Sequence, residues 1–138
     1  MPITVIASEG LFTAAAEQAL FADLTESFLA HHALTGNKFL EPNVIGEIAP
    51  IPKGKSFAGG KPADIVIVEL KVPSFALGSD AQKVDFVAAA TAAVLKASGG
   101  RVAKERIYVN MVHTADGLWG IGGKAYTNQA LLDAVGAA

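Results

Sequence analysis

The chain has 138 residues, of which 51% are hydrophobic and 17% are charged, so it is long enough and apolar enough to bury one ordinary core. A formal net charge of -2 excludes the broad basic surface that binding to nucleic-acid phosphates requires, and the absence of cysteine excludes disulfides and thiolate metal sites. Because no apolar run reaches the length of a membrane span and the first residues lack the pattern of a secretory signal, we expect a soluble, cytoplasmic protein without nucleic-acid or membrane partners.

Residues 2–50 predict a first strand-helix-strand unit. The β-branched segment 3–7 ends at a Glu-Gly turn, which is typical of a strand that begins almost at the first residue. Large apolar residues then recur at helical spacing over 20–28, and Gly36 is the expected stop of this helix. The segment 42–48 is extended again and is followed by a loop rich in Pro and Gly.

Residues 63–113 repeat the same order. The segment 65–70 is a continuous apolar, β-branched run, which indicates a central strand covered on both faces. Ser79 and Gln82 fit a capping box, so a second helix should start there and end at a Ser-Gly-Gly stop. The alternating segment 106–112 then predicts another strand.

The remaining residues, 114–138, contain a glycine-rich segment at 119–123 and predict a short terminal helix at 128–135. We therefore expect a single α+β domain over 1–138, with a mixed sheet built from two fused β-α-β units. Right-handed crossovers would place both long helices on one face of the sheet. No further large element is left to cover the other face, which favours an oligomer.

Five short segments resemble the tautomerase superfamily, and they occur along the chain in the order and at the spacing of that family. Residues 1–3, with the Glu-Gly turn that follows their strand, resemble the start of its 4-oxalocrotonate tautomerase branch, and 119–123 resemble the glycine-rich hairpin near the end of that branch. Residues 30–36 and 57–60 are similar to the cis-3-chloroacrylic acid dehalogenase branch. Residues 106–110 resemble a strand of the macrophage migration inhibitory factor branch, which has two fused units.

The resemblance implies a homotrimer with an active site around each amino-terminal proline and no cofactor. The chemistry of the family is proton transfer between keto and enol forms, and some of its members hydrate, dehalogenate or decarboxylate small acids. Removal of Met1 would give Pro2 a free secondary amine, and a free amino terminus has a pKa of roughly 7.7 to 8.0, which an apolar pocket lowers further. We expect this removal because proline is small, whereas a retained Met1 would leave Pro2 as an amide without a basic nitrogen.

Proton abstraction next to a carbonyl needs donors at the oxygen where negative charge develops. Lys38, Lys71, Tyr108 and Asn110 are the candidates, and Trp119 matches the aromatic wall of the family site. Each of these residues also has a purely structural interpretation. Lys38 could be a solvated loop lysine, and Lys71 a lysine at a sheet edge. Tyr108 could serve packing, Asn110 could bond to backbone, and Trp119 could be buried between subunits.

His31 matches the position of a functional histidine in the dehalogenase branch, and it follows Phe28 at helical spacing, which could aim it inward. A hydrogen-bonded histidine at a helix end is an equally good interpretation. The three histidines lack a carboxylate partner at metal-ligand spacing, so we assign no metal.

The arginines with which the family holds carboxylates are missing, because their positions read Leu11, Lys71-Val72 and Tyr108. Lysine does not reproduce the two-pronged fit of arginine to a carboxylate, so a diacid is disfavoured as substrate. The favoured function is a keto-enol tautomerase acting on a small carbonyl acid, with Pro2 as general base. One alternative is a hydratase, dehalogenase or decarboxylase of a three-carbon acid that uses His31, and another is a non-catalytic trimer that binds a ligand or protein.

Overall fold

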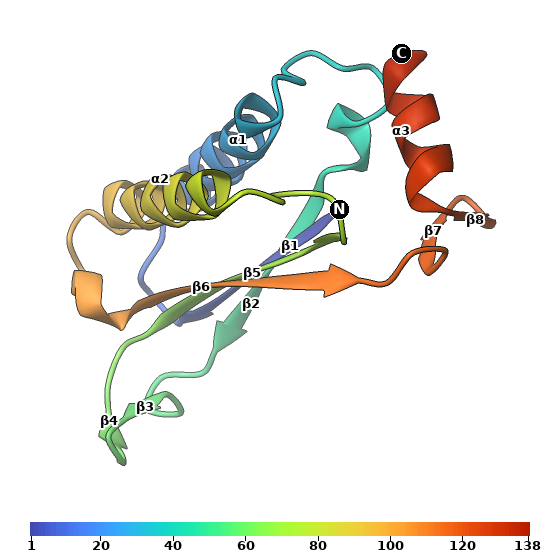
Figure 1. Ribbon diagram of the computed structural model, residues 1–138. Helices are drawn as coiled ribbons and strands as arrows, with labels where there is room; N and C mark the ends of the chain where they lie inside the picture. The colour runs from blue at the N-terminus through green and yellow to red at the C-terminus, as the bar shows by residue number, and fades with distance from the viewer.

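The computed structural model describes all residues, 1–138, and Figure 1 shows the arrangement of its elements. The helices are α1 (Ala14–His31), α2 (Asp80–Ser98) and α3 (Asn128–Gly136), and two short 3-10 helices are η1 (Glu41–Asn43) and η2 (Lys104–Arg106). The strands are β1 (Pro2–Ser8), β2 (Ile45–Ile51), β3 (Phe57–Ala58), β4 (Lys61–Pro62), β5 (Val66–Pro73), β6 (Ile107–Thr114), β7 (Trp119–Ile121) and β8 (Lys124–Tyr126).

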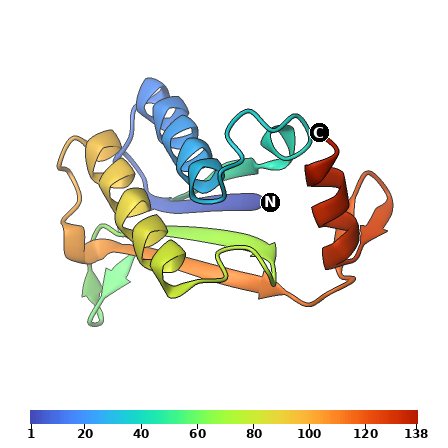
Figure 2. The same cartoon turned by 45° about the horizontal axis from the view of Figure 1, so that its top comes forward.

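The main sheet has four strands in the order β2-β1-β5-β6. Strand β1 is parallel to β2, β5 is parallel to β6, and the two pairs join through the antiparallel contact of β1 with β5. Helices α1 and α2 lie side by side on one face of this mixed sheet (Figure 2). The α+β fold class with two β-α-β units is therefore confirmed.

The core lies between this helix pair and the sheet. The side chains of Ile3 and Val5 on β1 are fully buried toward the helices. On β5, every second side chain from Val66 to Val72 is fully buried on the same face. Phe28 of α1 and Phe86 of α2 meet edge to face, with ring centroids 6.4 Å apart. Full burial of an aromatic side chain of this kind contributes about 1.5–3 kcal/mol, so this contact is a main link between the two units.

The predicted start of the second helix is confirmed in its detail. The Gln82 N–H donates to Ser79 Oγ at 3.1 Å, and the Ser79 N–H donates to Gln82 Oε1 at 3.2 Å, which closes the capping box. The first helix ends at His31 rather than near Gly36. Ala33 takes a left-handed conformation with φ of 55°, which ends the helix before the glycine is reached.

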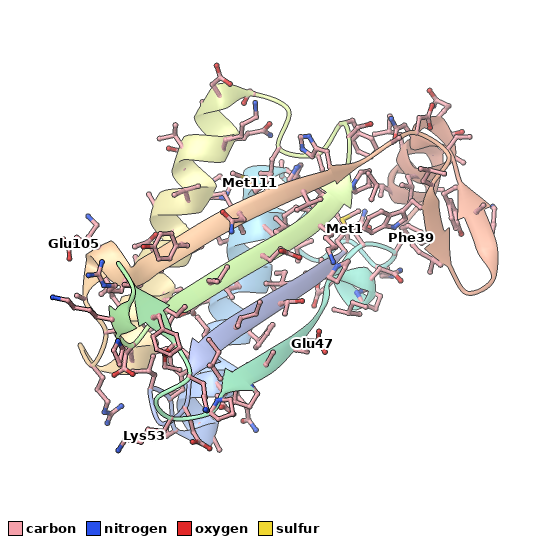
Figure 3. The ribbon with its side chains drawn as sticks, turned by 90° about the horizontal axis from the view of Figure 1, so that it is seen from below. Met1, Phe39, Glu47, Lys53, Glu105 and Met111 are labelled. Carbon is pink, nitrogen blue, oxygen red and sulfur yellow. The ribbon has the colours of Figure 1, made fainter.

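The other face of the sheet has no covering element (Figure 3). Side chains alternate along the strands, so Pro2 and Thr4 of β1 point to this open face. Several of its side chains are large, apolar and exposed, among them Ile45 at 59%, Tyr108 at 46% and Val112 at 41%. We call this surface the open face.

The C-terminal elements lie beyond the end of β6, close to the amino terminus (Figure 1). Helix α3 buries Leu131 completely, and the side-chain amide of Asn37 donates to the carbonyl of Val135 at 2.9 Å. These contacts hold the β7-β8 hairpin beside the start of β1. No helix of the protein is both long and apolar enough to cross a bilayer.

Candidate active site

A cavity of about 460 Å³ lies at the amino end of β1. Three of the predicted site residues line it together: Pro2 from β1, Lys71 from β5 and Trp119 from β7. Met1 also lines the cavity. The sequence positions of these residues span nearly the whole chain, so only the folded structure brings them together.

The pairing of β1 with β5 sets Pro2 beside Lys71. The antiparallel register places Ile3 opposite Leu70, and both of these side chains are fully buried toward the helices. Because the side chains alternate, the next residues, Pro2 and Lys71, point to the open face at neighbouring positions. A secondary amine at Pro2 would therefore have a cation close by.

Glu69 is a residue of this region that the sequence analysis missed. Its carboxylate Oε1 lies 3.3 Å from Lys71 Nζ, in an ion pair whose side chains are 31% and 52% exposed, respectively. Glu69 is also in register with Thr4 and with Asn110, on either side of β5. The available signal was the spacing of two residues from Lys71, which puts both side chains on one face of a strand.

Trp119 forms the apolar wall of the cavity and is only 9% exposed. Its indole Nε1 is the one buried side-chain nitrogen or oxygen of the protein that has no hydrogen-bond partner. A buried donor without an acceptor costs about 1–3 kcal/mol, and most buried polar groups avoid this cost by pairing.

Met1 is buried at this end of the sheet, where Figure 3 labels it. Its amino group donates to the carbonyl of Asn43, and its own carbonyl accepts from the Ile45 N–H at 3.2 Å. Burial lowers the pKa of the Met1 amino group from 8.0 to about 6, because the charged form loses hydration. An amine at this position is thus shifted toward its neutral, basic form.

Tyr108 and Asn110 line a different cavity, of about 650 Å³, together with Phe57 and Arg106. This second cavity opens on the same sheet, near the β3-β4 hairpin, and Tyr108 and Asn110 share one side of β6 as predicted. Within one chain the structure does not bring these two residues to Pro2. Their contribution to its site requires a second subunit.

Lys38 and His31 lie away from the Pro2 cavity. Lys38 lines a surface hollow with Glu41 in the loop that follows α1. The Nδ1 of His31 donates to the carbonyl of Ser27 at 2.5 Å, and its ring stands edge-on to Phe86 at 6.2 Å. His31 is therefore a hydrogen-bonded histidine at the end of a helix, and it lies on the side of the sheet that the helices cover.

The other two histidines are also bound to backbone. His113 Nε2 donates to the carbonyl of Ala76 at 2.9 Å, and His32 contacts Phe28 and Leu77. No group of three or more His, Cys, Asp and Glu side chains is arranged to hold a metal ion.

No protein-family model matches the sequence, and no curated protein matches it significantly. Solved structures match the fold over nearly the whole chain. A symmetric trimer of fused 4-OT has a TM-score of 0.76 at 16% identity, with 95% of this chain and 98% of that chain covered. N1, a member of the cis-3-chloroacrylic acid dehalogenase family, has a TM-score of 0.75 at 16% identity, with 100% of both chains covered.

Macrophage migration inhibitory factor from Toxoplasma gondii has a TM-score of 0.68 at 16% identity, with 91% of this chain and 100% of that chain covered. These three proteins represent the same three branches that the sequence motifs resemble. The recognition from sequence is thereby confirmed at the level of architecture: the chain has the fold of the tautomerase superfamily.

Proposed function

We propose that this protein is a keto-enol tautomerase of a small carbonyl acid, in which Pro2 is the general base after removal of Met1. The observation that carries the proposal is the shared cavity of Pro2, Lys71 and Trp119, because it joins a proton acceptor, a cation and an apolar wall. These are the groups that proton transfer next to a carbonyl needs.

The reaction moves one proton between carbon and oxygen. In the keto-to-enol direction, the lone pair of the Pro2 nitrogen takes a proton from the carbon next to the carbonyl, and the electrons of the broken C–H bond form the C=C bond. The carbonyl π electrons move to the oxygen, and the protonated Pro2 amine gives its proton to that oxygen, directly or through water, which completes the enol and restores the neutral amine. The amine must be neutral at the start, and the burial that lowers the pKa of the Met1 amino group would act on a Pro2 amine in the same way.

Lys71 is the proposed anchor of the substrate carboxylate. No arginine lines the cavity, and the ammonium group of Lys71 is already in an ion pair with the Glu69 carboxylate. One partly neutralised lysine suits a single carboxylate better than two. The proposed substrate is therefore a monoacid with an apolar body that contacts Trp119, and phenylpyruvate is the model compound.

The proposal includes a homotrimer. The open face exposes apolar side chains that an assembly would bury, and fused 4-OT, which has this fold, forms trimers. In such an assembly, Tyr108 and Asn110 of the neighbouring subunit would approach the Pro2 cavity and add their donors to it. The position of His31 beside Phe86, away from the cavity, gives no support to the hydratase or decarboxylase alternative.

The test is ketonisation of phenylenolpyruvate by purified protein whose Met1 removal has been verified by intact mass. Pro2→Ala should lower kcat/KM at least about 100-fold, since the primary amine that replaces proline is a differently positioned base. Pro50→Ala, an exposed proline of β2 outside the cavity, is the matched control and should retain wild-type activity. Equal activity of Pro2→Ala and wild type would contradict the proposal.

A further inference from the structure

The fold holds Met1 firmly in place. Met1 is only 6% exposed and belongs to the hydrophobic core. Its amino group donates to the carbonyl of Asn43, and its carbonyl accepts from the Ile45 N–H at 3.2 Å. The first residues of most domains are mobile unless secondary structure fixes them. Here both polar groups of Met1 are bound, next to the peptide bond that its removal must break.

The strand that Met1 precedes lies inside the main sheet, where Figure 3 shows it between its two neighbours. Strand β1 pairs with β2 from Pro2 onward and with β5 from Ile3 onward. An edge strand has to leave only one neighbour when its end opens, whereas this strand has to leave two. Ile3 is also fully buried against the helices. Release of the Met1–Pro2 bond from the sheet therefore requires local opening of the fold.

Removal of Met1 is a hydrolysis that an aminopeptidase carries out on a free chain end. Water adds to the Met1 carbonyl carbon, the C–N bond to Pro2 breaks, methionine leaves as the free amino acid, and the Pro2 nitrogen takes up a proton. The aminopeptidase has to bind the same amino group and carbonyl that the fold holds on Asn43 and Ile45. The folded chain cannot present these groups to a second active site while it keeps its own contacts.

We infer that folding ends the period in which Met1 can be removed, so that a chain that folds with Met1 keeps it in the Pro2 cavity. This inference rests on the proposed function and adds a regulation of the same site. Met1 lines the cavity together with Pro2, and its retention leaves the Pro2 nitrogen as an amide. The fraction of active protein is then decided before β1 joins the sheet, by the relative rates of cleavage and folding.

The test measures Met1 removal by intact mass, a readout that does not depend on any activity of the protein. Folded chain that retains Met1 is purified from cells in which methionine aminopeptidase is inhibited, freed of the inhibitor and treated with the purified aminopeptidase. A peptide of residues 1–10 in the same buffer is the unfolded reference. The folded chain should lose Met1 at least about 100-fold more slowly than the peptide, because cleavage follows the small population of opened molecules. Equal rates would overturn the inference.

Ile45→Pro tests the hydrogen bond that holds the Met1 carbonyl. Proline removes the Ile45 N–H, and β2 is an edge strand, where proline is tolerated. Ile45→Ala is the matched control, because it keeps the N–H and shortens only a side chain that is 59% exposed. Folded Ile45→Pro should lose Met1 at least about 10-fold faster than folded Ile45→Ala, since the strand end opens more often. Equal rates would show that this contact does not retain Met1. The comparison with the peptide needs no variant and decides the inference even if Ile45→Pro does not fold.

The mass readout separates this inference from the proposed function. If Met1-free protein fails to ketonise phenylenolpyruvate while the folded chain resists the aminopeptidase, the proposed reaction is wrong and the retention of Met1 by the fold stands. If ketonisation depends on Pro2 while the folded chain loses Met1 as fast as the peptide does, the reaction stands and the inference is wrong.

Discussion

Lys71 and Glu69 form an ion pair on the open face, with Nζ and Oε1 3.3 Å apart. Lys71 is the cation of the Pro2 cavity, so a carboxylate of the same chain already competes for the group that is proposed to bind substrate. The sheet explains the contact, because residues two apart on a strand point the same way. We therefore expect Glu69 to weaken the attraction of this cavity for an anion.

We expect Glu69→Gln to lower the KM for a 2-oxo monoacid about two- to fivefold with kcat nearly unchanged. Partly exposed ion pairs contribute about 0.2–1 kcal/mol, which limits the gain to this range. Glu47→Gln is the matched control, because Glu47 is an exposed carboxylate of β2 on the same face and forms no ion pair. Steady-state kinetics measure both variants, and an equal KM in wild type and Glu69→Gln would exclude competition by Glu69.

His32 ties the end of α1 to the loop that precedes α2. The Leu77 N–H donates to His32 Nε2 at 3.0 Å, so the ring proton is on Nδ1, which donates to the carbonyl of Phe28 at 2.8 Å. Leu77 is fully buried with φ of 49°, a strained conformation that these contacts stabilise.

His32→Phe should therefore lower the free energy of unfolding by about 1–3 kcal/mol, because it leaves the Leu77 N–H without an acceptor. Urea unfolding followed by circular dichroism gives the value. Thr35→Val is the control, since it removes only an exposed hydrogen bond to Glu26 and should cost less than about 0.5 kcal/mol. A loss as small as that of the control would show that the contact with Leu77 is dispensable.

The stability of the Met1-retaining chain should rise between pH 6 and pH 8. Burial lowers the pKa of the Met1 amino group in the folded state from 8.0 to about 6. Between these values the unfolded chain binds more protons than the folded chain, so stability increases with pH across this window and the penalty is largest below pH 6.

Protein expressed with methionine aminopeptidase inhibited provides the material, and urea unfolding at several pH values gives the slope. Acetylation of the Met1 amino group removes the titration and should flatten the curve in this window. An equal rise in acetylated and free protein would assign the pH dependence to other groups.

Val112→Asp should dissociate the proposed homotrimer. Val112 is exposed on edge strand β6 in the single chain, so the substitution has little effect on the isolated fold, but an assembled interface would have to bury the new charge. Val84→Asp is the control, because Val84 is 66% exposed on α2, away from the open face. Light scattering should give three times the chain mass of 14.2 kDa for wild type and control, and the mass of one chain for Val112→Asp. Trimers of Val112→Asp would place the interface elsewhere.

The sequence by itself determined the local elements. The apolar run at 65–70 predicts a central strand covered on both faces, and the structure places β5 between β1 and β6. Within the single chain only the face toward the helices is covered, so the second half of that prediction is not met. Ser79 and Gln82 predict a helix start because the side-chain oxygen of each accepts a hydrogen bond from the backbone N–H of the other. These signals are short-range and can be read from neighbouring residues.

Only the tertiary structure decided which residues meet. The register of β1 with β5 sets Pro2 beside Lys71 and adds Glu69, and it leaves Tyr108 and Asn110 at another cavity on the same sheet. The unpaired indole of Trp119 is likewise visible only once every possible acceptor has been placed. Strand pairing and hydrogen-bond satisfaction depend on segments far apart in the chain, so no local pattern specifies them.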